Sequence, residues 1–396
     1  MPAKGARAIS GFPSSCSVVS VLVVGGGICG LAAAWRLAEA GARVHVLDAG
    51  EIGHGATWAA GGMLAAALEA EPGEEGMAEL ARHSQALWPG WAARLASVTG
   101  IDVAYRGEGT LHMAASRDEL AALNHRYRFL RRLGLPVEWR EAAALRDLEP
   151  ALSPDVVGAI AAPGDHQVDP RAVVPALAAA ILAAGGRLSE RTPVAAIEPD
   201  GGGWAIRTAD GARQRADHLV LAAGAWSAGI AGLPPSARPP VRPAKGQAVV
   251  LGMDPAAPLL RHVVWGSGIY LVPRTDGRLY LGATVEDRGY DTRPTAGGVL
   301  SLLEAAWRLL PGLEELPIVE LVTGLRPRSR DDLPIVGPAG PPGLHLATGH
   351  HRNGILLAPA TAELVAAGVL GRPTDFAAAA FGPARFTPHT EVPVPA

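Results

Sequence analysis

The sequence predicts a mixed α/β (α+β) fold in which a discontinuous first domain is joined to a second domain built on an antiparallel sheet. Short apolar strands alternate with Ala- and Leu-rich helical stretches at both ends of the chain, a pattern typical of a sheet with helices on both faces. After a proline-rich connector at 234–243, several strand patterns follow one another. The 396 residues are enough for two domains.

The chain begins with a strand, a glycine-rich turn and a helix that together predict a Rossmann-like dinucleotide site. The apolar run Val18–Val24 predicts the strand, Gly25-Gly26-Gly27-Ile28-Cys29-Gly30 the turn, and Leu31–Ala40 the helix. In G-x-G-x-x-G the glycines permit a tight bend, close approach of a diphosphate, and close helix packing. A second strand, Val44–Leu47, ends in Asp48, where a carboxylate accepts hydrogen bonds from a ribose. The alternative interpretation is a glycine-rich turn in an ordinary βαβ unit.

The later elements are predicted in order along the chain. Leu80 to Leu135 has a mainly helical pattern, interrupted by a strand-like piece at Thr110–Ala114. A helix at Pro170–Ala184 has prolines near its first turns. The remaining expected strands are 194–197, 204–208, 219–223, 247–251, 270–272, 279–285 and 344–347, and the remaining expected helices are 296–310 and 355–370. The wholly apolar run 219–223 predicts a strand buried on both faces.

Strands from both ends of the chain imply that two inserts interrupt the dinucleotide-binding domain. We expect this domain to comprise residues 17–82, 151–235 and 323–385. The inserts, residues 83–150 and 236–322, are expected to form the substrate domain. Because ligand pockets favour domain interfaces, we expect the functional site between the two.

Composition and charge exclude several classes of partner. The formal net charge is −3 and no run of one sign is sustained, so neither nucleic acid nor a membrane surface is indicated. The apolar stretch after Lys4 and Arg7 is explained by the first strand, turn and helix rather than by a signal peptide, and residues 1–15 are expected to be a loose extension. Cys16 and Cys29 cannot make a disulfide framework, so we expect a cytoplasmic protein. Common hydrolase motifs, Gly-x-Ser-x-Gly and Gly-Lys-Ser, are missing from the sequence.

Two further segments of small residues predict an extended cofactor surface. From Gly53 to Met63 the chain reads Gly-His-Gly-Ala-Thr-Trp-Ala-Ala-Gly-Gly-Met, a loop whose backbone amides can lie against a second part of a long cofactor. The run Ala222-Ala223-Gly224 offers another close approach. A nicotinamide enzyme has no particular need of the first segment, which favours a different dinucleotide.

In this order, the patterns resemble the D-amino-acid oxidase superfamily of FAD-dependent amine oxidoreductases. Later blocks resemble the glycine oxidases of thiamine biosynthesis: Tyr270-Leu-Val-Pro-Arg274, Gly282-Ala-Thr284, Gly324-Leu-Arg-Pro327, Asp332-Leu-Pro-Ile-Val-Gly337 and Gly349-His-His-Arg-Asn-Gly-Ile-Leu-Leu357. The resemblance covers nearly the whole chain after residue 17. Val285 departs from it, since a bulkier apolar residue is implied there, and this leaves the preferred size of the amine open.

The resemblance implies a cofactor, a substrate class and a set of site residues. It implies FAD, a small amino acid or amine with a carboxylate, dioxygen as electron acceptor, and a homo-oligomer, either dimer or tetramer. The residues expected to bind FAD are Gly25, Gly27, Ile28, Cys29, Gly30, Asp48, Ala49, Ala56, Thr57, Gly61, Gly62, Met63, Val194, Gly224, His350, His351, Arg352, Asn353, Gly354, Ile355 and Leu356. The expected catalytic residues, which hold the substrate carboxylate, are Arg326, Tyr270 and Arg352. No metal is implied.

Physical arguments support two of these roles independently. A reduced flavin carries negative charge near N1 and the C2 carbonyl, which a helix N-terminus stabilises, and Arg352-Asn353-Gly354 opens such a helix. A fixed guanidinium binds a carboxylate through two parallel hydrogen bonds. Arg326 is followed by Pro327, which stiffens the backbone and suits a pre-positioned group.

Each catalytic candidate also has a structural interpretation. Arg326 is alternatively a surface arginine between loops, and Arg352 alternatively pairs with a carboxylate such as Asp331. Tyr270 alternates with apolar neighbours, as a core residue does.

A metal site and a reactive thiol are not expected. His350 and His351 are adjacent, so they cannot face the same way in regular structure, and no other His or Cys cluster has ligand spacing. Cys29 is expected to be a small buried residue rather than a thiol attached to flavin.

The function that these observations predict is FAD-dependent oxidative deamination of glycine, and of small amines or D-amino acids, to an imine or glyoxylate, ammonia and hydrogen peroxide. The product is expected to feed thiazole synthesis. Alternatives are an oxidase or dehydrogenase of sarcosine, a D-amino acid or a proline-like amine, a nicotinamide-dependent dehydrogenase, and a non-catalytic flavin-binding subunit.

Overall fold

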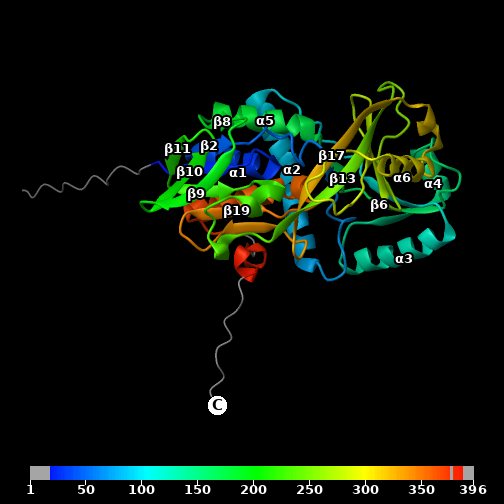
Figure 1. Ribbon diagram of the computed structural model, residues 1–396. Helices are drawn as coiled ribbons and strands as arrows, with labels where there is room; N and C mark the ends of the chain where they lie inside the picture. The colour runs from blue at the N-terminus through cyan, green and yellow to red at the C-terminus, as the bar shows by residue number, and fades with distance from the viewer. Residues whose placement is uncertain (1–17, 375–377, 387–396) are drawn as a thin grey trace, which may run out of the picture.

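The structure, a computed structural model, describes residues 18–374 and 378–386. Two lobes lie side by side, one carrying α1, β2 and β19 and the other carrying β13, β17 and α6 (Figure 1). Cys16 and the extension expected at residues 1–15 lie outside the described residues. Among those described, no helix combines the length and apolarity needed to cross a membrane.

The first lobe is organised around a six-stranded sheet of order β18-β19-β12-β1-β2-β8, whose strands come from the beginning, middle and end of the chain. Its strands are β1 (Ser20–Val24), β2 (Arg43–Leu47), β8 (Arg187–Ser189), β12 (His218–Leu221), β18 (Ile335–Pro338) and β19 (Leu344–Thr348). All neighbours are parallel except the edge strand β18. The prediction of a discontinuous Rossmann-like domain is therefore confirmed.

Alternate side chains of this sheet meet two different layers. Val21 and Val23 of β1 pack with helices, whereas Leu22 and Val24 point to the opposite face. The helices on the first face are α1 (Ile28–Glu39), α2 (Glu75–Thr99), α5 (Pro170–Ala183) and α7 (Gly354–Leu370). The opposite face is covered by an antiparallel sheet of β9 (Val194–Asp200), β10 (Gly203–Thr208) and β11 (Arg213–Ala216). The expectation of helices on both faces is thus wrong, because the buried side chains of Trp204 and Ile206 cover the second face instead.

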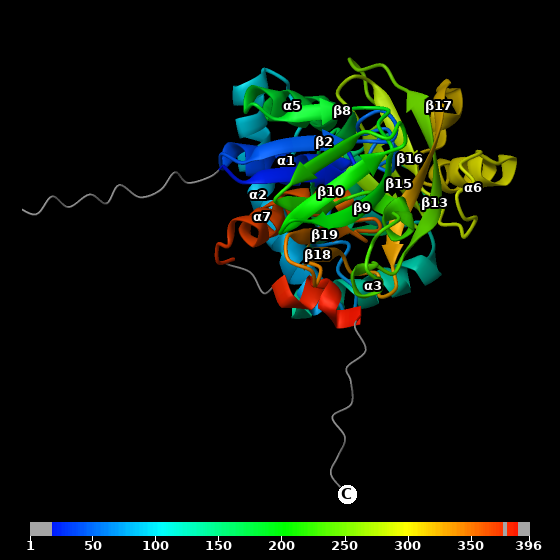
Figure 2. The ribbon, with the colours of Figure 1, turned by 60° about the vertical axis from the view of Figure 1, so that its left-hand side comes forward.

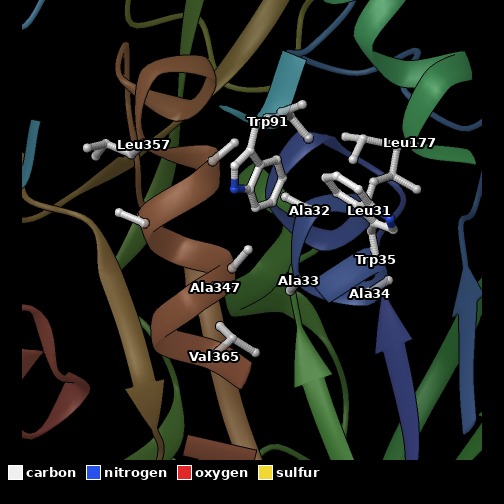
Figure 3. Close-up of a cluster of buried hydrophobic side chains, with 14 of the residues drawn as sticks. Leu31, Ala32, Ala33, Ala34, Trp35, Trp91, Leu177, Ala347, Leu357 and Val365 are labelled. Atoms are coloured by element: carbon white, nitrogen blue, oxygen red, sulfur yellow. The ribbon is translucent and has the colours of Figure 1, made fainter. Parts of the chain in front are cut away.

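Small residues let the helices of the first layer pack closely (Figure 3). Ala32, Ala33 and Ala34 of α1 are fully buried, so at these positions α1 presents little side-chain volume to its neighbours. Trp35 of α1 and Trp91 of α2 meet edge to face, with ring centroids 4.8 Å apart. Helix α7 is apolar and buried along nearly its whole length because it lies against α1, α2 and the sheet.

The second lobe contains an eight-stranded sheet of order β17-β13-β16-β15-β14-β4-β6-β5. Its strands are β4 (Thr110–Ala114), β5 (Glu138–Glu141), β6 (Gly158–Ala162), β13 (Val241–Gly252), β14 (Val263–Gly266), β15 (Ile269–Pro273), β16 (Arg278–Gly282) and β17 (Ile318–Ser329). Every pair is antiparallel except β14 with β4, which confirms the predicted antiparallel sheet. Figure 2 shows α6 on the outside of this sheet.

The helices of the second lobe and the short elements complete the fold. The helices are α3 (Arg117–Arg132), α4 (Ala142–Leu148) and α6 (Ala296–Trp307). A two-stranded sheet joins β3 (Met63–Leu64) to β7 (His166–Gln167). The 3-10 turns are η1 (Gly224–Gly229), η2 (Pro235–Ala237), η3 (Pro311–Glu315), η4 (Ala378–Phe381) and η5 (Pro383–Phe386).

Several expected domain boundaries fall within elements or on the wrong side of them. The boundary at 82/83 lies inside α2, whose apolar side continues in the core of the first lobe as far as Leu95. The boundary at 150/151 assigns β6 to the first domain, although β6 pairs with β4 and β5. The boundary at 322/323 cuts β17. We propose that the first insert begins after α2. We also propose that β6 and the whole of β17 belong to the second domain.

Candidate active site

A cavity of about 960 Å³ lies where the carboxyl ends of the parallel strands meet the second lobe. Val24, Leu47 and Thr348, from the ends of β1, β2 and β19, line it, which is where ligands bind in open α/β sheets. Expected site residues along the cavity are Gly25, Gly27, Ile28, Cys29, Asp48, Ala49, Ala56, Thr57, Gly61, Gly62, Met63, Val194, Gly224, Tyr270, Arg326, His350, His351, Arg352, Gly354 and Ile355. Gly30, Asn353 and Leu356 do not line it.

The glycine turn has the geometry that a diphosphate site requires. Gly25 has φ +109°, and a Cβ on Gly30 would lie 2.0 Å from the carbonyl oxygen of Gly25, so the third glycine permits close packing of helix and strand. Helix α1 has neither a side-chain cap nor an acidic residue in its first turn. The Ile28 N–H donates to Thr57 Oγ1 at 3.0 Å. The start of α1 therefore offers a positive helix end beside the cavity.

Asp48 is fixed at the end of β2, beside the glycine turn. Its Oδ2 accepts from the Gly26 N–H at 2.7 Å, and its Oδ1 accepts from the Gly50 N–H at 2.8 Å. These bonds hold the carboxylate in one orientation next to the cavity, where its remaining lone pairs are available to a ribose.

A second helix begins on the cavity at Gly354, as predicted. Helix α7 has no side-chain cap and no acidic residue in its first turn, and Gly354 and Ile355 line the cavity. Leu356 instead lies behind it, where its carbonyl oxygen accepts from Ser84 Oγ and Trp88 Nε1. One elongated cavity with positive helix ends at both α1 and α7, and with Asp48 beside it, fits a dinucleotide with a second negatively charged part.

Arg326 lies on β17, a strand that the sequence did not predict. Its guanidinium passes over the backbone of Gly246, where a Cβ would lie 2.3 Å from Nη1. Arg326 Nη1 donates to the carbonyl oxygen of Thr284 at 3.0 Å. Among the described residues no carboxylate pairs with this half-buried cation. Arg326 is therefore held in place inside the cavity with donors left over for an anion.

Tyr270 of β15 lies beside Arg326 and is fixed by packing. Its ring lies so close to Gly61 and Gly282 that a Cβ on either would come within 2.9 Å and 2.7 Å of it, respectively. Its ring stacks with Tyr280 at a centroid distance of 6.1 Å. Burial raises the pKa of Tyr270, and the Arg326 guanidinium opposes this shift. The phenol therefore remains a neutral hydrogen-bond donor at physiological pH.

Arg352 lines the cavity but is already paired. Its Nε lies 2.6 Å from Glu69 Oε2, and this carboxylate is the main cause of its raised pKa. The alternative interpretation, in which Arg352 pairs with a carboxylate, agrees with this contact, but the partner is Glu69 and not Asp331, which binds Arg385 at 2.8 Å. Glu69 balances the charge of Arg352, which leaves Arg326 as the stronger anion-binding group.

The two adjacent histidines lie in different surroundings. His350 is buried, and its Nε2 lies 2.8 Å from Thr361 Oγ1. His351 has φ +48°, and its Nδ1 lies 3.8 Å from Asp332 Oδ1. Burial lowers the pKa of each to about 4, so both are neutral at pH 7. In residues 18–374 and 378–386, no group of three His, Cys, Asp or Glu side chains could hold a metal ion.

Cys29 is a half-buried thiol that lines the cavity. Its Sγ lies 3.9 Å from the Gly354 carbonyl oxygen, between α1 and α7. Burial raises the pKa of Cys29 to about 12, so a reactive thiolate does not form near neutral pH.

Sequence reasoning missed residues that shape the site from a distance. Gly246 makes room for Arg326, and Thr284 provides its acceptor. Glu69 pairs with Arg352 from far away in the sequence. The Gly282-Ala-Thr284 block was a usable signal for Thr284, but nothing local marks Gly246 or Glu69, since their partners are distant in the chain.

Comparison with known proteins identifies the family of this chain. The DAO family, described as FAD dependent oxidoreductase, matches residues 20–367. A glycine oxidase of Geobacillus kaustophilus is 38% identical over 91% of this chain and 95% of its own length. The bifunctional protein ThiO/ThiG of Trichormus variabilis is 37% identical over 90% of this chain and 53% of its own length.

Solved structures agree with the sequence relatives. The crystal structure of glycine oxidase from Geobacillus kaustophilus has a TM-score of 0.87 and 37% identity, covering 93% of this chain and 100% of that chain. Coverage of this extent includes both lobes. This chain belongs to the DAO family of FAD-dependent oxidoreductases.

Proposed function

We propose that this protein is a glycine oxidase, which uses FAD to deaminate glycine and similarly small amines or D-amino acids. The observation that carries the proposal is Arg326, a cation fixed in the cavity with no carboxylate partner among residues 18–374 and 378–386. A guanidinium with free donors binds a carboxylate through two charge-assisted hydrogen bonds. Relatives named glycine oxidase support a small amino acid as the molecule that brings this carboxylate.

In the proposed complex, Arg326 and Tyr270 hold the substrate carboxylate. Arg326 supplies two N–H donors, and the neutral phenol of Tyr270 supplies an O–H. Both side chains are fixed by glycines, Gly246 under the guanidinium and Gly61 against the ring, so little ordering is needed when substrate binds. The substrate is thereby oriented with its Cα hydrogen toward the cofactor.

Helices α1 and α7 are proposed to hold FAD from both ends. The glycine turn before α1 and the carboxylate of Asp48 would contact the diphosphate and the ribose. The start of α7 at Gly354 would stabilise negative charge on the ring system. When bound, FAD would supply a two-electron acceptor for the hydride of the amine carbon, with dioxygen as the final electron acceptor. The resulting imine hydrolyses to glyoxylate and ammonia, and dioxygen leaves as hydrogen peroxide.

The cellular setting is part of the same proposal. This chain matches about half the length of bifunctional ThiO/ThiG proteins, which supports a role in thiamine biosynthesis. A cytoplasmic location and a homo-oligomer, dimer or tetramer, remain expectations. Light scattering on the purified protein measures the oligomeric state.

The absorption spectrum of the purified protein before and after anaerobic glycine tests the proposal. We expect flavin absorbance that glycine bleaches and air restores, with one peroxide formed per glycine oxidised. Sarcosine, D-alanine and D-proline provide the comparison, and the amine with the highest kcat/KM identifies the preferred substrate. Failure of glycine to bleach the flavin, with bleaching by another amine, refutes glycine as substrate. Failure of every amine indicates a non-catalytic flavin-binding subunit.

A further inference from the structure

Arg274 is a buried arginine that has no part in the proposed chemistry. It follows β15 directly, at the opposite end of that strand from Tyr270, and is 6% exposed. Its Nη1 donates to Gln167 Oε1 and to the carbonyl oxygen of Val168, both at 2.8 Å. Its Nη2 donates to the carbonyl oxygen of Gly61 at 2.5 Å. The guanidinium of Arg274, which belongs to the second lobe, therefore donates hydrogen bonds to three acceptors of the first lobe.

The acceptor Gly61 belongs to a tightly determined part of the cavity wall. Gly61, Gly62 and Met63 line the cavity in sequence, and the Gly62 carbonyl oxygen accepts from the Val168 N–H at 2.9 Å. Gly62 has φ +71°, and a Cβ there would lie 2.1 Å from the Val168 carbonyl oxygen and 3.0 Å from Arg274 Nη2. Arg274 and Val168 thus hold two consecutive carbonyls of this segment.

Burying this cation costs free energy that its acceptors only partly offset. None of the three acceptors is charged, and the nearby carboxylate of Asp169 pairs with Arg278 instead. Burial lowers the pKa of Arg274 to about 10, so the guanidinium is still protonated at pH 7. A buried arginine bound only to neutral acceptors is unusual enough to require a reason beyond packing.

We propose that Arg274 is a positioning residue for the cofactor. It holds the Gly61–Met63 segment in the shape that fits the flavin, and it links this segment to the strand that carries Tyr270. The inference rests on the FAD site of the proposed function but not on the identity of the amine. FAD affinity and substrate orientation would then depend on the same strand.

A matched control separates this role from simple docking of the two lobes. Arg278 begins the neighbouring strand β16 and also crosses to the first lobe, where it pairs with Asp169. Its other carboxylate partner is Asp276, and it makes no hydrogen bond to the Gly61–Met63 segment. Loss of Arg278 should therefore weaken lobe contacts without reshaping the flavin surface.

The experiment compares apo-proteins of wild type, Arg274→Met, Arg274→Lys and Arg278→Met. FAD affinity is measured by fluorescence quenching, the flavin environment by the visible spectrum, and stability by thermal unfolding with and without FAD. We expect Arg274→Met to raise the FAD Kd about tenfold or more and to reduce the rise in Tm that FAD produces. Arg274→Lys keeps the charge and should fall between wild type and Arg274→Met. Arg278→Met should lower the Tm of the apo-protein but change the FAD Kd by no more than about twofold.

Specific results overturn the inference. A folded Arg274→Met protein with the wild-type FAD Kd and visible spectrum excludes a positioning role. Equal losses of FAD affinity in Arg274→Met and Arg278→Met show general lobe contact instead. If Arg274→Met does not fold, Arg274→Lys decides, because a wild-type FAD Kd in that variant also overturns the proposal. No readout needs glycine turnover, so failure of the proposed substrate leaves this test intact.

Discussion

Replacement of Arg326 by methionine tests the carboxylate-binding role most directly. Methionine keeps much of the apolar stem above Gly246 but removes the charge and all five N–H donors. Within the described residues the change removes the hydrogen bonds of Arg326 to the carbonyl oxygen of Thr284 and to the side chain of Tyr270. The change should therefore affect substrate binding far more than folding.

The expected magnitude follows from the hydrogen bonds that are lost. Two charge-assisted bonds at about 1.5 kcal/mol each give a loss of about 3 kcal/mol. At about 1.4 kcal/mol for each factor of ten, kcat/KM for glycine should fall roughly 150-fold. Arg326→Lys keeps the charge but loses the paired geometry, so a fall of roughly tenfold is expected. The FAD Kd should stay within about twofold of wild type in both.

These effects are measured in two ways: by peroxide release under steady-state conditions and by anaerobic flavin reduction at varied glycine concentration. Arg328→Met is the control, because Arg328 lies two residues away on β17 but binds Asp332 through two hydrogen bonds outside the cavity. That variant should retain the wild-type kcat/KM within about threefold. An Arg326→Met enzyme with unchanged kcat/KM for glycine would refute the reasoning, since the substrate carboxylate must then bind elsewhere.

Three further predictions concern the cofactor, the phenol and acid stability. Asp48→Ala should raise the FAD Kd about tenfold or more, measured by fluorescence titration, and leave KM for glycine unchanged at saturating FAD. Tyr270→Phe should lower kcat/KM about tenfold. Because burial raises the pKa of Tyr270, any loss of wild-type activity from ionisation of this phenol should begin at a higher pH than for an exposed tyrosine. Burial lowers the pKa of His350 from 6.5 to about 4 in the folded protein. The neutral His350 side chain therefore contributes to stability above pH 6.5, and this contribution is lost as the pH falls toward 4, because the unfolded state then binds the proton more readily. His350→Gln should therefore lose less Tm between pH 7 and pH 4.5 than wild type, and parallel losses would contradict this explanation.

Local signals were sufficient for the elements that hold the cofactor. The strand, glycine turn and helix from Val18 onward can be recognised from neighbouring residues alone, although β1 forms its hydrogen bonds with β2 and the distant β12. The helix from Pro170 is similarly local, since Asp169 caps it by accepting from the Arg171 N–H at 2.9 Å. The start of α7 at Gly354 was also predicted, because the polar Arg352-Asn353 precedes an apolar helical run.

Elements that depend on distant pairing could not be predicted in the same way. The 318–329 segment is a strand because it pairs with Val241–Leu251 of β13, and its own sequence does not indicate this distant partner. The β9–β11 sheet covers a face for which the βαβ pattern predicts helices, because either kind of layer can bury an apolar sheet face. The domain boundaries that we propose therefore differ from those expected from the sequence, since a boundary follows packing rather than composition.

Arg326, which lines the cavity, and Arg274, which lies behind its wall, show why residue type alone did not decide function. Arg274 and Arg326 both belong to the second lobe, and Arg274 reaches the first lobe through the carbonyl oxygen of Gly61, just before β3. Arg274 uses three hydrogen bonds on protein acceptors and does not line the cavity. Arg326 donates one hydrogen bond to the carbonyl oxygen of Thr284 and lies on the cavity wall. Since a guanidinium has five N–H donors, Arg326 keeps more of them free than Arg274 does. We therefore propose Arg326 as the group that binds an incoming anion and Arg274 as the group that shapes the wall around it.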